Sequence, residues 1–446
     1  MRKSACLLIA FAFFACRPSP LDQSPSLTPP IGSPDSAAST WQPSQGFVVH
    51  EWGTLTSVLG SDGVLLPGLH HEEEDLPPFV ADRMKQAQTT PWVVQKMETP
   101  VTYFYSAQPL AATASVRFPD GIFSQWYPFA QDIAPPLLLT GAPQASDPWL
   151  DAGALQSQIP PECQGKFDRF HDGLLDWGTV DVLARDDSPA LPGPVDGTNW
   201  GFARNVASNA IAATLPDGSR QNERFLFYRG LGNFTLPLAA TVGNDGPTLA
   251  NGATQTLGGL FLMVVTADGA GFASLGDLAP GSSVSAPLPA PAMAHDAFVA
   301  ALKAAVRDRL VRDGLFTDEA QAMVDTWAKS WFLTPGVRAF YLLPQAITDA
   351  VIPLSISPAP SETRRTMVIR VELLTPSYEA QLSSWLSSLA SGDASARQEF
   401  LGLGRFAEPH LQRAIALAKT DAERAAGQSL LDEIRANRRW SPTTAE

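Results

Sequence analysis

The hydrophobic and polar positions along the chain divide it into a leader, a polar segment and a longer body. An unbroken apolar run at residues 5–15 follows Arg2 and Lys3. Residues 17–45 then contain few large apolar side chains. From Phe47 onward, apolar runs alternate with turn residues, as is typical of a folded domain.

The body is predicted to begin with the strand FVVHEWGTLTSV, because its side chains alternate between two faces with a period of two. The turn sequence GSDG and the apolar run VLLPGL follow. We therefore expect a β-hairpin with Asp62 and Gly63 at its tip. In either of its two plausible registers, this hairpin brings His50 and Glu51 to the same end as the run HHEEED at residues 70–75.

Short β-branched or aromatic runs continue to about residue 290, separated by Gly, Pro, Asn and Asp. This pattern predicts an antiparallel, sandwich-like body over residues 46–290, with its binding groups on loops. The expected strands include residues 101–107, 114–118, 224–230, 236–242, 259–268 and 271–286.

Helical spacing of apolar residues begins near residue 293 and predicts a helical hairpin, followed by a helix capped by Thr375. The runs RAFYLLP and MVIRVELL have strand character and could return to the sheet. We therefore predict an α+β fold with a β-rich domain at 46–290 and a mainly helical region at 291–446. Two further helices are expected at 409–419 and 421–437.

The leader, residues 1–16, has the positive start and short apolar run of an export signal. The run is shorter than the ~20 residues of a membrane-spanning helix. Ala15 followed by Cys16 resembles the lipobox of bacterial lipoproteins, in which the cysteine is acylated. Phe13 and Phe14 depart from that pattern, so an ordinary signal peptide cut nearby is the alternative.

The Pro-, Ser- and Thr-rich residues 17–45 are predicted to form a disordered tether, since they cannot bury enough apolar surface to offset the entropy of ordering. A lipid on Cys16 followed by this tether would hold a folded body off a membrane. We therefore expect an exported cell-envelope protein, and Arg17 after the cysteine favours the outer membrane by its similarity to lipoprotein sorting patterns.

The formal net charge of −14 over 446 residues argues against nucleic acid and anionic membrane surfaces as partners. A cation is a more suitable partner. Of the three cysteines, Cys6 and Cys16 lie in the leader, so Cys163 alone remains in the body. Without an internal disulfide, stability must come from burial of the core.

Residues 70–75 place two adjacent histidines beside four consecutive carboxylates, and the predicted hairpin brings His50 close to them. Together these side chains form a ligand set that suits zinc or another first-row divalent ion. A nearby free glutamate could act as general base on metal-bound water. The alternative is a solvated charge run, with His50 bonded to backbone. The candidate metal ligands are His50, His70, His71 and Glu73, and the candidate catalytic base is Glu51.

Several aromatic residues are candidates for a groove that binds a glycan or a peptide, namely Trp126, Tyr127, Trp149 and Trp200. The alternative is that they are buried core aromatics.

The segments FVVHEWGTLTSV, KMETPVTYFY, FLFYRGLGNF, EAQAMVDTWAKSWF and RVELLTP resemble an uncharacterised bacterial exported-protein family marked by a His-Glu-Trp-Gly-Thr segment. The resemblance covers residues 47 to about 376. It implies export and a shared fold, and it implies no activity. The GxSxG, GxxxxGK[ST], HExxH, CxxC and EF-hand patterns are absent from the sequence, which argues against nucleotide-dependent chemistry.

Two functions remain open from the sequence. The first is an anchored envelope protein that binds a protein, glycan or small-molecule ligand. The second is a metal-dependent hydrolase with a His/Glu site formed by residues 50–51 and 70–75. Metal content would separate the two, because only the second requires a divalent ion.

Overall fold

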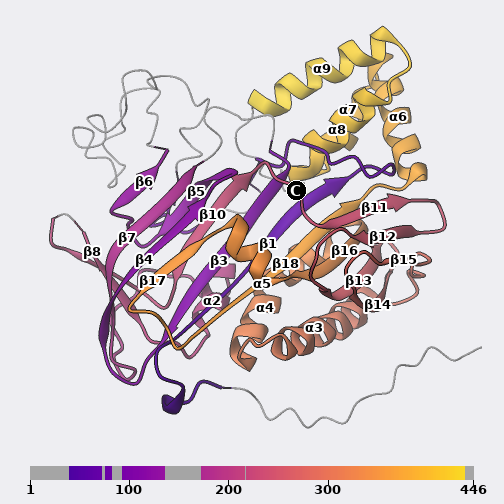
Figure 1. Ribbon diagram of the computed structural model, residues 1–446. Coiled ribbons are helices and arrows are strands. Elements are labelled where there is room, and N and C mark those ends of the chain that lie inside the picture. The colour runs from indigo at the N-terminus through magenta and orange to yellow at the C-terminus, as the bar shows by residue number, and fades with distance from the viewer. Residues whose placement is uncertain (1–39, 73–75, 83–92, 136–171, 216, 437–446) are drawn as a thin grey trace, which may run out of the picture. The chain divides into compact units, whose positions relative to one another are not determined.

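A sheet of nine strands forms the centre of the fold (Figure 1). The computed structural model describes residues 40–72, 76–82, 93–135, 172–215 and 217–436. The order of strands across the sheet is β14 (Ala270–Leu278), β13 (Leu257–Val265), β16 (Gly336–Leu343), β18 (Glu362–Leu373), β1 (Val48–Leu59), β3 (Gln95–Tyr105), β10 (Leu226–Gly232), β5 (Gly121–Tyr127) and β2 (Ala81–Asp82).

Strand β1 lies in the middle of this sheet and is buried along its whole length. It pairs in parallel with β18 and antiparallel with β3. Val49 and Leu55 pack into one hydrophobic cluster, whereas Val48 and Trp52 pack into another. The predicted alternation of faces is therefore present, and apolar layers cover both faces.

The predicted hairpin between β1 and residues 64–71 is wrong. The returning chain forms a single bridge at the end of β1, between Leu59 and Leu65. Pro67 cannot donate to a ladder and Gly68 adopts a φ of 109°, so this segment cannot continue as a strand. Strands β3 and β18 instead satisfy the backbone groups of β1 along both edges.

Two smaller sheets cover one face of the nine-stranded sheet and share a hydrophobic cluster with it. That cluster contains Leu55 from the large sheet together with Trp177 and Leu249 from the two smaller sheets. One of these sheets has three strands, β11 (Leu238–Val242), β12 (Pro247–Asn251) and β15 (Ser283–Ser285). The other has six, β17 (Leu354–Ser357), β4 (Leu110–Phe118), β7 (Gly173–Val182), β8 (Ile211–Thr214), β9 (Arg220–Glu223) and β6 (Asp132–Ala134).

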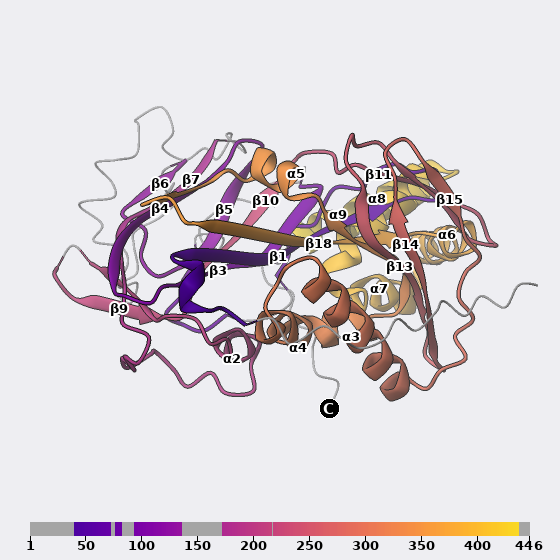
Figure 2. The same ribbon diagram turned by 60° about the horizontal axis from the view of Figure 1, so that its bottom comes forward.

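Helices α3 (His295–Arg312) and α4 (Thr317–Leu333) cover the opposite face of the central strands, as Figure 2 shows. Phe298, Leu302 and Leu310 recur at helical spacing on α3 and are all buried, so α3 presents a single apolar face to the core. The short helix α2 (Asn199–Arg204) joins the same layer.

Four helices at the C-terminal end form a third hydrophobic cluster with the ends of the central strands. Thr375 caps the first of them by accepting a hydrogen bond from the Tyr378 amide, and Pro376 occupies the first helical position. No helix in the described part of the chain is long and apolar enough to cross a membrane. The remaining elements are η1 (Pro43–Gln45), α5 (Gln345–Val351), α6 (Pro376–Ala390), α7 (Ala394–Leu401), η3 (Gly404–Phe406), α8 (Ala407–Ala416) and α9 (Asp421–Ala436).

The predicted α+β class, with a β-rich N-terminal part and helices toward the C-terminus, is confirmed. Strands β16 and β18 come from the region predicted to be mainly helical, and they lie in the centre of the sheet, where β18 pairs with β1 and β16 pairs with β18. Residues 40–45, assigned to the tether from composition, belong to the folded body. Trp41 is buried and stacks on Tyr105, so an aromatic side chain ties this end of the segment to the core.

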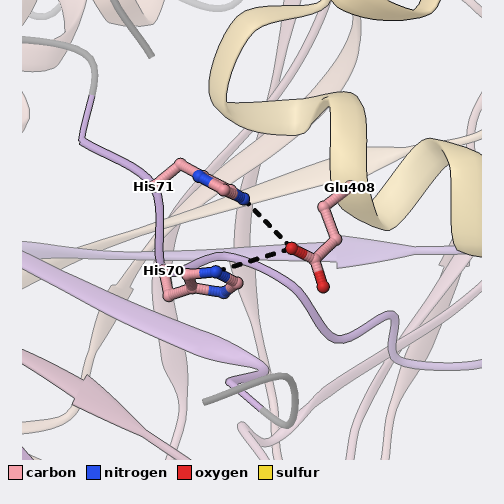
Figure 3. A group of neighbouring side chains, drawn as sticks. All are labelled: His70, His71 and Glu408. Atoms are coloured by element: carbon pink, nitrogen blue, oxygen red, sulfur yellow. Dashed lines mark hydrogen bonds and ion pairs between the residues drawn. The ribbon is translucent and has the colours of Figure 1, made fainter. Parts of the chain in front are cut away.

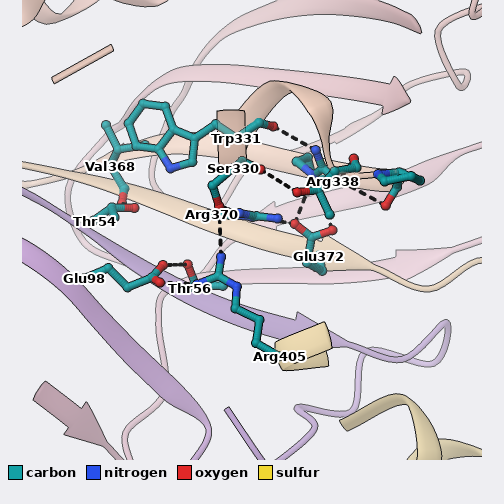
Figure 4. A network of polar contacts seen from close by, with 12 residues as sticks. Thr54, Thr56, Glu98, Ser330, Trp331, Arg338, Val368, Arg370, Glu372 and Arg405 are labelled. Atoms are coloured by element: carbon teal, nitrogen blue, oxygen red, sulfur yellow. Dashed lines mark hydrogen bonds and ion pairs between the residues drawn. The ribbon is translucent and has the colours of Figure 1, made fainter. Parts of the chain in front are cut away.

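A network of buried charges joins the sheet to the C-terminal helices (Figure 4). Arg405 of η3 donates to Glu98 of β3 and to Ser330 Oγ of α4, the latter at 3.3 Å. Arg370 and Arg338 donate to Glu372 Oε1 at 2.6 and 3.0 Å. Since each carboxylate in this network is paired, the charges are tolerated inside the protein.

The buried Glu98 carboxyl should make stability depend on pH. Burial alone would raise the pKa of Glu98. The charges of Arg405 and Lys96 outweigh this effect and lower the pKa to about 2. The ionised form therefore stabilises the folded state fully above the unfolded-state pKa of about 4.3, and this contribution is lost as the pH falls toward 2. The Glu98→Gln variant should be less stable at pH 7 and should lose less stability between pH 4.5 and 2.5, as measured by urea unfolding.

Glu362→Gln is the matched control, because Glu362 is an exposed carboxylate on β18. Its unfolding curves should follow those of the wild type at each pH. Equal pH dependence in Glu98→Gln and the wild type would contradict the prediction.

Candidate metal site

His70 and His71 lie on the segment that follows β1, and they face the first turn of helix α8 (Figure 3). Leu66 and Leu69 anchor this segment in the C-terminal hydrophobic cluster. At Gly68 a Cβ atom would lie 2.5 Å from Glu408 Cγ, so only glycine permits the segment to approach α8 this closely.

Both imidazoles point to the same carboxylate oxygen. The Nε2 atoms of His71 and His70 lie 3.0 and 3.5 Å from Glu408 Oε2. The two rings are 4.2 Å apart between centroids. All three side chains are buried, with exposed fractions of at most 3%.

The other carboxylate oxygen of Glu408 is held by groups outside this trio. Arg435 Nε and Gln412 Nε2 donate to Oε1 at 2.8 and 3.0 Å. Hydrogen bonds to the second oxygen orient the carboxylate, as partners around metal-ligating residues commonly do. Oε2 is therefore directed at the two histidines.

Several imidazole nitrogens in this trio have no hydrogen-bond partner among the residues that the structure describes. They are Nδ1 and Nε2 of His70 and Nδ1 of His71, and all are buried. An unsatisfied buried polar group costs about 1–3 kcal/mol. A ligand able to accept lone pairs from both rings would remove part of this cost.

Electrostatics keep His70 and Glu408 in the protonation states that metal ligation requires. Burial, followed by the neighbouring His71, lowers the pKa of His70 to about 3, so this imidazole is neutral at neutral pH. Burial raises the pKa of Glu408, but its hydrogen bond from His71 and its contacts with His70 and Arg435 lower it below the usual value. The carboxylate is therefore ionised, and metal ligation needs a neutral imidazole and an ionised carboxylate.

Two buried cations, Lys96 and Arg229, hold the segment that carries His70 and His71 in place. Lys96 Nζ donates to the His71 carbonyl and lies 3.1 Å from Glu72 Oε2. Arg229 donates to the same Glu72 oxygen at 3.0 Å. These contacts tie the segment to β3 and β10.

Two imidazoles and one carboxylate are a ligand set typical of zinc and other first-row divalent ions. One donor atom from each of His70, His71 and Glu408 lies within 4.8 Å of the other two. Ligands at about 2.0–2.2 Å from a tetrahedral ion lie about 3.4 Å apart, so small side-chain rotations would close the set around an ion.

His50 does not join this site, and its predicted role as a ligand beside His70 and His71 is wrong. Its Nδ1 atom lies 2.8 Å from Glu319 Oε2, and its ring stacks on Phe316. His50 is opposite Tyr103 in the sheet, whereas the His71 carbonyl accepts from Lys96, which lies seven residues before Tyr103 on β3. At about 3.3 Å per residue, the two places are ~20 Å apart.

Glu51 is not a free base beside the metal ligands, so its predicted catalytic role is also wrong. Its Oε1 atom accepts hydrogen bonds from Arg365 Nε and Nη2 at 2.8 and 2.6 Å. Tyr228 and Thr102 donate to Oε2 at 2.6 and 2.9 Å. The carboxylate lies on the opposite face of β1 from His50 and is fully occupied.

The other predicted residues fall into two groups. Glu73, Cys16 and Trp149 lie outside the described residues, as do the leader and tether as far as residue 39. Trp126 and Tyr127 are buried, as the core interpretation predicts.

Glu408 was missed by sequence reasoning. It lies 337 positions from His71, in the first turn of a helix where a glutamate is expected for capping or dipole reasons alone. No local pattern distinguishes it from other helical glutamates. The contact arises only when α8 packs against the segment that follows β1.

Comparisons with known proteins supply no family for this chain. No protein-family model and no curated protein matches the sequence. The yeast delta-COP-I mu-homology domain bound to a Dsl1 WxWxV peptide is similar at 9% identity and a TM-score of 0.26, covering 74% of this chain and 98% of that one. The same yeast domain without the peptide is similar at 8% identity and a TM-score of 0.25. That match covers 74% of this chain and 97% of the yeast domain. Similarity at this level carries no argument about fold or function, so the family resemblance noted from the sequence stays a prediction.

Proposed function

We propose that this protein is an exported, lipid-anchored cell-envelope protein that binds a divalent first-row metal ion through His70, His71 and Glu408. Export and anchoring rest on the leader and on Cys16. Metal binding rests chiefly on the convergence of two buried imidazoles on one oriented carboxylate oxygen, since several of their nitrogens have no partner within the described ranges.

The ion would join two parts of the fold that are distant in the sequence. His70 and His71 follow β1 of the central sheet, and Glu408 begins α8 of the C-terminal helices. The burial of all three ligands favours a structural role over hydrolysis, since structural sites are closed to solvent. The partner that the anchored body binds is a protein, a glycan or a small molecule, and the anchor places it at a membrane.

Elemental analysis of protein purified without added metal tests the proposal. We expect about one zinc, or another first-row divalent ion, per chain. His71→Ala and Glu408→Gln should each lose the ion, because two remaining ligands cannot hold it against a chelator.

His295→Ala and His50→Ala are the controls. His295 Nε2 contacts the Thr266 backbone carbonyl at 2.9 Å, and His50 is bound to Glu319, so both variants should keep the wild-type metal content. Metal loss in the controls, or metal-free wild type that takes up no zinc on titration, would overturn the proposal.

A further inference from the structure

Glu408 presents only one of its two carboxylate oxygens to the histidines (Figure 3). Oε2 faces the imidazoles of His71 and His70 at 3.0 and 3.5 Å. Oε1 instead accepts hydrogen bonds from Arg435 Nε at 2.8 Å and from Gln412 Nε2 at 3.0 Å. A carboxylate oxygen has about two lone-pair sites, so these two donors occupy Oε1 fully.

The two donors hold Glu408 from different elements. Gln412 lies on α8, one turn after Glu408, and its Nε2 also donates to the Pro67 carbonyl at 3.3 Å. The same amide group therefore ties the carboxylate to the segment that follows β1. Arg435 lies in the last turn of α9, and its side chain is 25% exposed whereas that of Glu408 is fully buried. Together the two contacts prevent the carboxylate from turning both oxygens toward the histidines.

Further ligands for an ion are scarce at this place. Within the described ranges, no fourth His, Cys, Asp or Glu atom joins the group of His70, His71 and Glu408. These side chains are at most 3% exposed, so solvent does not reach them freely. Zinc is commonly held by four ligands, whereas manganese favours six that are mostly oxygens. Three single-atom donors in a buried place therefore suit the ion of lower coordination number.

We infer that Gln412 and Arg435 are positioning residues that confine Glu408 to one coordinating oxygen and thereby make the site select zinc over manganese. This selection rests on the proposed metal site, and it specifies both the ion and the residues that decide between ions. Neither positioning residue binds the ion, because both act through the Glu408 carboxylate. A carboxylate released at Oε1 can turn and bind an ion through both oxygens, which raises the coordination number and favours manganese.

The ratio of the zinc and manganese affinities measures this effect better than either affinity alone. The Arg435 guanidinium repels any divalent cation, so its removal strengthens metal binding, while the loss of orientation at Glu408 weakens it. Zinc and manganese carry the same charge, so the repulsion acts on both alike. The ratio therefore depends on the geometry of the carboxylate and not on the charge of Arg435.

Titration of the chelator-treated full chain with zinc and with manganese, each in competition with a chelator of known affinity, tests the inference. Arg435→Met and Gln412→Leu each remove one donor and keep an apolar side chain in its place. We expect the zinc-to-manganese affinity ratio to fall about tenfold or more in each variant. Arg435→Lys keeps a donor for Oε1, so its ratio should stay closer to that of the wild type.

The visible absorption of bound cobalt(II) provides a readout that a change of stability alone does not alter. Four-coordinate cobalt(II) absorbs much more strongly than six-coordinate cobalt(II), so the spectrum depends on the coordination number. The bands should weaken in Arg435→Met and Gln412→Leu and should be retained in Arg435→Lys.

Arg424→Met is the matched control. Arg424 lies on the same helix, α9, where it is 47% exposed and pairs with Asp421. Its affinity ratio and cobalt spectrum should equal those of the wild type.

A wild-type ratio in Arg435→Met and Gln412→Leu would overturn the inference and leave the proposed metal site intact, whereas a wild type that binds neither ion would overturn both. Circular dichroism verifies that each variant is folded. If one of the two does not fold, a wild-type ratio in the other is sufficient to overturn the inference.

Discussion

Replacement of Arg365 by methionine is expected to destabilise the protein by about 3–5 kcal/mol, because it leaves the Glu51 carboxylate buried without its counter-ion. Arg365 makes two hydrogen bonds to Glu51 and one to the Ile352 carbonyl at 2.6 Å. Both charged side chains are at most 2% exposed. Urea unfolding at pH 7 measures the effect as a lower transition midpoint.

The double variant Glu51→Gln/Arg365→Met separates the cost of an unpaired charge from the loss of packing. With both charges removed, most of the stability should return, since buried ion pairs are often replaceable by neutral groups of similar volume. Arg364→Met is the surface control, because Arg364 is 39% exposed on the same strand, and it should change stability by less than about 0.5 kcal/mol. A single variant Arg365→Met within about 1 kcal/mol of the wild type would contradict the argument.

Glu51 and its neighbour His50 show which structural features can be predicted from the sequence. The alternation in the His-Glu-Trp-Gly-Thr segment correctly predicts a strand that sends Glu51 and His50 to opposite faces. This alternation depends only on local backbone geometry, because successive side chains of a strand point to opposite faces. A two-residue period of apolar positions in the sequence therefore indicates a strand directly. The cap at Thr375 and the C-terminal helices were predictable for the same reason, because capping and helical spacing are local signals.

Long-range partners were not predictable from such signals. The expected hairpin assumed that β1 pairs with the chain nearest to it in sequence, whereas β1 pairs with β18, more than 300 positions away. The error carried over to the metal site, since His50 and Glu51 were assigned to it through that hairpin. His70 and His71 were identified correctly as neighbours in a polar cluster, but their carboxylate partner comes from α8.

Zinc should stabilise the folded protein in proportion to the logarithm of its free concentration. At a hundredfold excess over the dissociation constant, an ion that binds only the folded state adds about 2.7 kcal/mol to the free energy of unfolding. Chelator-treated protein should therefore show an unfolding midpoint that rises with added zinc. The gain should be absent from His71→Ala and unchanged in His295→Ala, because His295 lies on α3 outside the proposed site.

The position of this stabilisation distinguishes the proposed site from nonspecific binding to surface carboxylates. An ion held by His70, His71 and Glu408 joins residues 66–72 to α8, so amide hydrogen exchange should slow in those two segments first. Nonspecific binding would instead affect exposed acidic regions and would persist in His71→Ala. Because His71 and Glu408 already contact each other at 3.0 Å, protection without zinc should be partial. A uniform change in exchange across the chain would exclude a local clamp.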